Sequence, residues 1–110
     1  MDKNTEQLFI YHLTLTPYYK NPKNWTEATF QMIQEHATFL DNLGKQGILA
    51  FAGRTNLAFE DENLFGIAII KANTLEQAKA ILKNDPAVLN GIQQANIFPF
   101  WMGIRHLNNL

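Results

Sequence analysis

The stretch at residues 48–70, ILAFAGRTNLAFEDENLFGIAII, contains two short apolar runs that are separated by an acidic segment. The first run, residues 48–53, and the second, residues 64–70, have the length and composition of buried β-strands. The segment between them, residues 55–63, holds three acids and two asparagines, so it is expected to form an exposed connection. The stretch therefore predicts a β-hairpin in the middle of the chain.

A helix is predicted before this hairpin, over residues 26–43. Apolar side chains recur there with helical periodicity and occupy one half of the helix, while polar side chains fill the other half. Asn24, with Glu27 three residues later, has the spacing of an N-cap and its reciprocal acid. His36 is the only ionisable residue in the apolar half, so one imidazole is expected on the face that packs inward.

A second helix is predicted after the hairpin, opened by the capping pair Thr74 and Gln77. When its helical wheel is continued, Asp85 falls in the middle of the apolar side, immediately before Pro86. A proline disfavours helical backbone at the residue that precedes it. Asp85 is therefore expected to close the apolar face at the end of this helix, and residues 86–91 are expected to form a short turn.

Two further strands are predicted near the ends of the chain, at residues 8–16 and 94–102, because apolar side chains alternate there with a period of two. Pro99 cannot donate a ladder hydrogen bond, so the last strand is expected to lie at a sheet edge or to carry a bulge. Residues 17–24, with two prolines, are expected to form a loop. The element order predicts an α+β fold of the βαββαβ type, with an antiparallel sheet and both helices on one face.

The 110 residues are enough for one domain and too few for two independent cores. The chain is 46% hydrophobic and contains eight Phe, three Tyr and two Trp, a large apolar load for so small a surface. Several predicted strands are apolar on both sides, but two helices cover only one face of a sheet. We therefore expect a homodimer that forms through the uncovered sheet face.

The composition argues against several classes of site and partner. The chain has no cysteine, which excludes a disulfide framework, a thiolate metal site and a cysteine nucleophile. It also has no serine, which excludes a serine nucleophile. His12, His36 and His106 are too scattered to predict a metal site, and no cofactor is expected. Nine Lys and Arg against ten Asp and Glu, with no basic block, argue against nucleic acid. The polar segment at residues 1–7 and the lack of a membrane-length apolar run predict a cytoplasmic protein with no membrane partner.

His36 and Asp85 are the residues on which chemistry is expected. Each is the single ionisable group on an apolar helix face, and the predicted fold makes the two helices neighbours. A hydrogen bond between them would satisfy a buried acid and hold the imidazole in one tautomer. Two interpretations are open at this point. Either the pair is a buried structural hydrogen bond, or Asp85 orients His36 so that its other ring nitrogen acts as a general base or acid.

Arg54 is a candidate substrate-binding residue because it ends a strand beside Gly53 and the acidic connection. A guanidinium there could bind a carboxylate or phenolate through two contacts. The other interpretation is an ordinary surface ion pair with Glu60 or Asp61. The hydrogen-bond and ion-pair partners of the Arg54 side chain in the structure distinguish these two interpretations.

An ordered set of short motifs in this sequence resembles the YCII-related (YciI-like) family over about residues 8–102. The resemblance implies a ferredoxin-like fold of the dimeric α+β barrel type, relatives that include muconolactone-isomerase-like proteins, and an active-site pair at His36 and Asp85. The chain departs from the family pattern at its proline-rich loop after the first strand and at Arg54, where many relatives have proline. The motifs are HATFL at 36–40, GILAFAG at 47–53, GIAII at 66–70, EQA at 76–78, NDP at 84–86 and IFPF at 97–100.

Two functions from different classes are expected from these residues. The first is a small-molecule enzyme that uses His36 and Asp85 for proton transfer on an aromatic or enolisable ligand. Such an enzyme would be of lyase or isomerase type, and some family members are associated with dehydrochlorination of chlorinated hydroxyquinols. The second is a ligand-binding or structural homodimer in which the same pair is only a buried hydrogen bond. A free ring nitrogen of His36 that faces a cavity would favour the enzyme.

Overall fold

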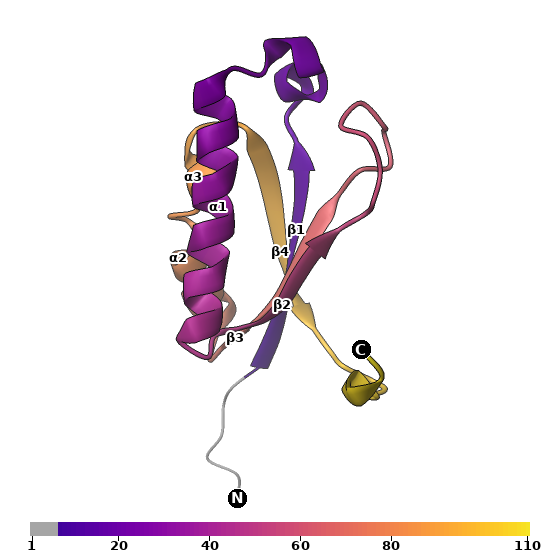
Figure 1. The fold of residues 1–110 in the computed structure, drawn as a ribbon. Coiled ribbons are helices and arrows are strands. Elements are labelled where there is room, and N and C mark those ends of the chain that lie inside the picture. Colours follow the sequence, from indigo (N-terminus) through magenta and orange to yellow (C-terminus); the bar gives the residue numbers. More distant parts are fainter. Residues whose placement is uncertain (1–6) are drawn as a thin grey trace, which may run out of the picture.

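The computed structural model describes residues 7–110, so residues 1–6 of the polar first segment lie outside the described residues. Three helices lie on one face of a single four-stranded sheet (Figure 1). This is the α+β arrangement that the sequence predicts. The elements are β1 (Gln7–Leu15), α1 (Glu27–Lys45), β2 (Leu49–Arg54), β3 (Gly66–Ala72), α2 (Leu75–Leu82), α3 (Pro86–Leu89) and β4 (Gln93–Phe100), with 3₁₀ turns η1 (Pro17–Lys20), η2 (Pro22–Asn24) and η3 (Leu107–Asn109).

The sheet has the strand order β2-β3-β1-β4, and every neighbouring pair is antiparallel. In the central register, Ile10 of β1 lies opposite Ile69 of β3 and Phe98 of β4. Pro99 lies in β4, which is an edge strand, as its missing N–H predicts. The register shift in the sheet is in the other edge strand, between Leu49 and Phe51 of β2.

The start of α1 differs from the prediction. Its N-cap is Thr26, whose side chain accepts a hydrogen bond from the Thr29 N–H, while the Thr29 hydroxyl accepts one from the Thr26 N–H. Asn24 was predicted to cap the helix, but its side-chain amide donates to the Tyr18 carbonyl at 2.7 Å. The Asn24 side chain is therefore bound to the 3₁₀ turn that precedes it. A cap at Asn24 would start the helix at residue 25, but the helix starts at Glu27.

The segment around Asp85 also differs from the prediction. Residues 86–91 were expected to form only a turn, but Pro86–Leu89 is a short helix, and Asp85 is its N-cap. Asp85 therefore begins α3 rather than ending α2. The physical reason is that proline suits the first position of a helix, where its missing N–H costs nothing, and aspartate is a favoured cap.

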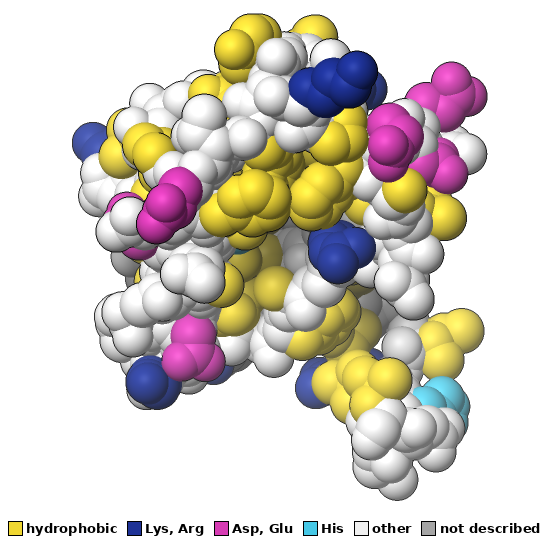
Figure 2. Space-filling view, turned by 45° about the horizontal axis from the view of Figure 1, so that its top comes forward, with side chains coloured by type: hydrophobic (Ala, Val, Ile, Leu, Met, Phe, Trp, Pro, Cys, Tyr) yellow, Lys and Arg dark blue, Asp and Glu magenta, His cyan; other side chains and the backbone are white. Residues whose placement is uncertain are grey.

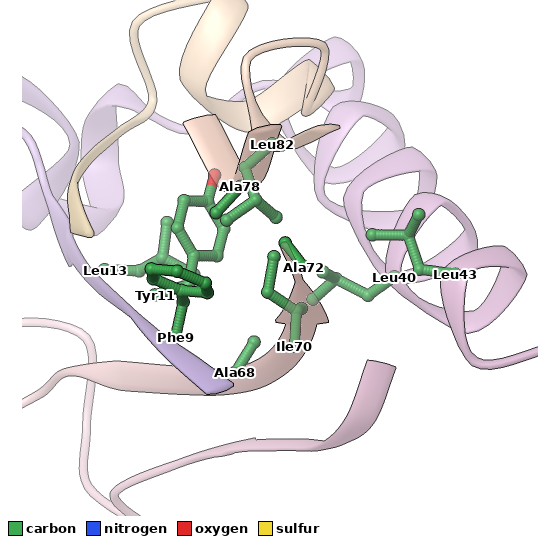
Figure 3. Packing of buried hydrophobic residues seen from close by; sticks show 10 residues of the cluster. All are labelled: Phe9, Tyr11, Leu13, Leu40, Leu43, Ala68, Ile70, Ala72, Ala78 and Leu82. Atoms are coloured by element: carbon green, nitrogen blue, oxygen red, sulfur yellow. The ribbon is translucent and has the colours of Figure 1, made fainter. Parts of the chain in front are cut away.

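The core lies between the helices and the sheet. Alternate side chains of β1 point into it, and α1 and α2 cover it from the other side (Figure 3). This core holds the helices against the sheet and so determines where residues from different elements meet. Its buried members are Phe9, Tyr11, Leu13, Leu40, Leu43, Ala68, Ile70, Ala72, Ala78 and Leu82.

The opposite sheet face is also apolar and has no helix over it (Figure 1). Phe51, Phe98 and Phe100 are exposed on this face, and His12 stacks on Phe65 with ring centroids 5.2 Å apart. The prediction of strands with two apolar sides is confirmed. Within residues 7–110, neither α1 nor any shorter helix has the apolar length that a membrane crossing requires.

Gly47 allows the chain to turn from α1 into β2, because its backbone has a φ of +79°. We expect Gly47→Ala to lower the free energy of unfolding by about 1 kcal/mol, since a side chain is disfavoured in the left-handed region. Urea unfolding measures this loss. Gly53→Ala is the matched control, because its new Cβ meets no atom within 4 Å and its φ is not positive. Equal losses in the two variants would contradict a left-handed backbone at Gly47.

Candidate functional site

The structure brings His36 and Asp85 into direct contact. His36 lies on α1, and Asp85 lies at the start of α3. The His36 Nδ1 atom is 2.8 Å from both carboxylate oxygens of Asp85. The two residues are 49 positions apart in the chain, so the packing of α1 against α3 is what forms the pair.

Asp85 is fully buried, and its carboxylate has two further partners. The Tyr11 hydroxyl donates to Oδ2 at 2.8 Å, and the Ala87 N–H donates to Oδ1 at 3.0 Å. A buried carboxylate costs several kcal/mol unless hydrogen bonds and charges compensate it. Three donors from three different elements supply that compensation, so the acid has a fixed position and cannot rotate freely.

Tyr11 lies on the apolar side of the first predicted strand, and the sequence pattern did not predict its role at this site. Burial raises the pKa of the Tyr11 hydroxyl well above its usual range, and the neighbouring Asp85 charge and hydrogen bond raise it further. The hydroxyl therefore stays protonated and donates to Asp85. The available signal was that Tyr11 has the only polar side-chain atom among the buried side chains of β1, where a hydroxyl needs a partner.

His36 also lines a cavity of about 520 Å³. The His36 side chain is 14% exposed, and none of the described residues hydrogen-bonds its Nε2 atom. Because Asp85 accepts a hydrogen bond from Nδ1–H, the neutral ring carries its lone pair on Nε2. The pair therefore combines an oriented imidazole with a space that is large enough for one small ring.

The cavity lies between α1 and the β2–β3 hairpin, at the end of the sheet where β1 and β2 end. In Figure 2, this end of the molecule is hollowed, and hydrophobic side chains gather around the hollow. Trp25 and Phe59 form part of its wall and stack with ring centroids 4.5 Å apart. Phe59 belongs to the acidic connection, where the sequence pattern predicts only an exposed loop, so its role was not predicted.

Arg54 is the last residue of β2 and lines the same cavity at its exposed mouth. Its Nη1 atom donates to the Thr55 carbonyl at 3.2 Å. Among residues 7–110, the ion pairs are His36–Asp85 and Asp41–Lys45, so the predicted alternative of a salt bridge with Glu60 or Asp61 is not formed. The guanidinium is thus placed where it could meet an anionic group of a ligand.

Neither His12 nor His106 lines this cavity. His12 is on the uncovered sheet face, and His106 is exposed in the segment after β4. Within the part of the chain that the structure describes, no three His, Cys, Asp or Glu side chains form a group that could hold a metal ion. The candidate site therefore consists of His36 and Arg54, which line the cavity, and of the buried Asp85 and Tyr11, which hold His36 in place.

Tyr11→Phe tests the hydrogen bond to Asp85 through the pH dependence of stability. An unfolded tyrosine loses its proton near pH 10, while the folded Tyr11 keeps it. The wild type is therefore expected to lose free energy of unfolding as the pH rises above 10, and the variant is expected to lose less. At neutral pH the variant should be about 1–3 kcal/mol less stable, because the buried Asp85 loses a donor.

Urea unfolding between pH 7 and 11 measures both effects. Tyr18→Phe is the matched control, because Tyr18 is exposed and is expected to keep the wild-type profile. Parallel pH profiles for the wild type and Tyr11→Phe would show that the Tyr11 hydroxyl is not held protonated.

Comparisons with known proteins agree with this fold. A sequence comparison with curated proteins gives no match. The chain is similar in structure to a 5-chloro-2-hydroxyhydroquinone dehydrochlorinase from Burkholderia phenoliruptrix AC1100, solved in complex with 2,5-dihydroxybenzoquinone. The TM-score is 0.63 and the identity 16%, over 87% of this chain and 95% of that chain. For SnoaB, a cofactor-independent oxygenase from Streptomyces nogalater, the TM-score is 0.45 and the identity 12%, over 93% of this chain and 96% of that chain.

The likeness to the dehydrochlorinase supports the α+β fold that the sequence predicts. At 16% identity this likeness is one of fold alone. The sequence model of the family described as the YCII-related domain matches residues 13–101 of this chain. Because the matched residues make up most of the chain, we conclude that the protein belongs to the YCII-related family.

Proposed function

We propose that the protein is an enzyme that moves a proton on a small aromatic or enolisable substrate, with His36 as the general base and acid. The observation that carries this proposal is the two-sided environment of the His36 ring. Asp85 holds Nδ1 at 2.8 Å, and the ring also lines the cavity, where a substrate would meet Nε2. A structural hydrogen bond alone would not require the ring to border a cavity.

In the proposed reaction, Nε2 accepts a proton from an acidic carbon of the substrate. The electron pair of the broken C–H bond moves toward a neighbouring carbonyl oxygen and forms an enolate. Asp85 stabilises the imidazolium that results, and Tyr11 and Ala87 keep the carboxylate in place. Arg54 at the cavity mouth is suited to bind the oxygen that becomes negative.

The fate of the proton determines the reaction type. In an isomerase, His36 returns the proton to a different carbon of the same molecule. In a lyase, the enolate expels a leaving group such as chloride together with its bonding electron pair. The dehydrochlorinase with a similar fold, which binds 2,5-dihydroxybenzoquinone, supports testing chlorinated hydroxyquinols first. A cavity of about 520 Å³ also suits a single substituted ring.

His36→Gln tests this proposal most simply. We expect the variant to lower the rate of proton transfer by about 10²-fold or more, because glutamine cannot accept the proton. The reaction is followed as exchange of carbon-bound hydrogen for solvent deuterium in hydroxyquinol, and as chloride release from 5-chloro-2-hydroxyhydroquinone. His106→Gln, which lies away from the site, is expected to keep the wild-type rate.

Wild-type activity that persists in His36→Gln would reject the acid–base role. A second candidate function, that of a non-catalytic ligand-binding protein, is supported by the cavity itself. In that case the wild type should bind hydroxyquinols without exchange or chloride release, and Asp85→Asn should lower stability without any effect on chemistry.

The uncovered sheet face supports the proposal that two copies of the chain form a homodimer. Phe51 on one edge strand and Phe98 and Phe100 on the other are exposed on a face whose strand positions between them are largely apolar. Monomeric proteins rarely expose an apolar patch that spans several strands. A second copy, packed sheet to sheet, would cover this patch with the same patch of its own surface.

Phe98→Glu is expected to shift the protein from dimer to monomer, because it places a charge in the proposed apolar interface. Sedimentation equilibrium measures the mass of both forms. Leu89→Glu is the matched control, since Leu89 is exposed on the helix-covered side and is expected to leave the dimer intact. A wild type that sediments as a monomer at micromolar concentration would contradict the dimer.

A further inference from the structure

Gln93 carries a buried polar atom that none of the described residues satisfies. It is the first residue of β4 and lines the cavity that His36 also lines. Its Oε1 atom is buried and accepts no hydrogen bond, and among residues 7–110 it is the only buried side-chain nitrogen or oxygen in this condition. Buried acceptors are nearly always paired, so an unpaired acceptor on a residue that lines a cavity indicates a partner other than residues 7–110.

The backbone that carries Gln93 is held firmly. Gln93 lies opposite Leu15 in the β1–β4 ladder, so its side chain points to the same sheet face as the buried Leu15. Directly before it, the Thr16 N–H donates to the Ile92 carbonyl at 3.0 Å, and the Thr16 hydroxyl donates to the Gly91 carbonyl at 2.7 Å. The backbone of Gln93 therefore has a fixed position. A fixed backbone reduces the entropy that is lost when the side chain binds a ligand.

The polar side chains of the cavity are distributed unevenly. Arg54 and Asp41 are exposed and lie at the mouth, and Asp41 is paired with Lys45. His36 and Gln93 are half-buried, on α1 and β4 respectively, and apolar side chains surround them. A ring in this cavity would thus meet a base, a neutral amide and, toward solvent, a guanidinium.

We propose that Gln93 determines substrate specificity by accepting a hydrogen bond from a neutral hydroxyl group on the substrate ring. This inference rests on the proposed function of the cavity as a substrate site and names the substituent that the site recognises. An amide oxygen accepts only from a donor, so it favours a hydroxyl over a halogen or an ether oxygen at the same ring position. Arg54 has the opposite preference, since it binds an oxygen that is or becomes negative.

Phenol and fluorobenzene are matched probes for this preference. They have the same ring and a substituent of similar size, but only phenol has a donor. Kd values for both are measured by NMR titration of wild type and Gln93→Leu. The ratio of the fluorobenzene Kd to the phenol Kd is expected to be about tenfold higher in the wild type, the loss that follows when one buried hydrogen bond is removed.

Gln94→Leu is the matched control for this substitution. Gln94 is the next residue, its side chain lies on the opposite sheet face, and its amide donates to the Thr14 hydroxyl at 3.3 Å. The Kd ratio of this variant should equal that of the wild type. Gln93→Leu should also raise the Tm of the free protein, because it removes an unpaired buried acceptor, whereas a structural role for Gln93 predicts a lower Tm.

His36→Gln separates this inference from the proposed reaction. If His36→Gln and the wild type show the same Kd ratio and Gln93→Leu lowers it, Gln93 recognises the hydroxyl, whether or not proton transfer is detected. If the wild type and Gln93→Leu have equal ratios, or the wild type does not bind phenol, the specificity role is overturned even where His36 supports turnover.

Discussion

The buried carboxylate of Asp85 is the group on which the site depends. Its hydrogen bonds join α1 through His36, β1 through Tyr11 and α3 through Ala87. Removal of any one partner would leave part of a buried acid unsatisfied, so these three elements are stable together in one arrangement. The same hydrogen bonds that satisfy the acid also orient the imidazole, and packing and chemistry therefore have a common physical origin here.

The parts of this site that could be predicted from the sequence are those that break a local pattern. His36 and Asp85 each interrupt an apolar helix face, so both stood out and their contact followed from the predicted fold. The short helix α3 could not be predicted in this way, because Pro86 is as suited to ending one helix as to beginning the next. Tyr11 fits its apolar strand face and was for that reason overlooked.

Residues whose roles depend on tertiary structure were beyond the reach of sequence patterns. Phe59 lies in an acidic loop, and only the folded chain brings it against Trp25 in the cavity wall. Gln93 is one polar residue among several at the start of β4, and its unpaired oxygen becomes visible only once every possible donor has a position. In the mechanism proposed above, His36 supplies the proton transfer, Arg54 binds negative charge, and Gln93 selects a neutral hydroxyl.

The tautomer of His36 tests the central claim most directly, because general-base chemistry at the cavity requires the lone pair on Nε2. Long-range ¹H–¹⁵N correlation spectra of ¹⁵N-labelled protein at mildly alkaline pH report which ring nitrogen carries the proton. A proton on Nδ1, with Nε2 unprotonated and its resonance shifted when phenol is added, is the expected result. A proton on Nε2, or an Nε2 resonance that phenol does not affect, would contradict the role of Asp85 in directing this nitrogen to the substrate.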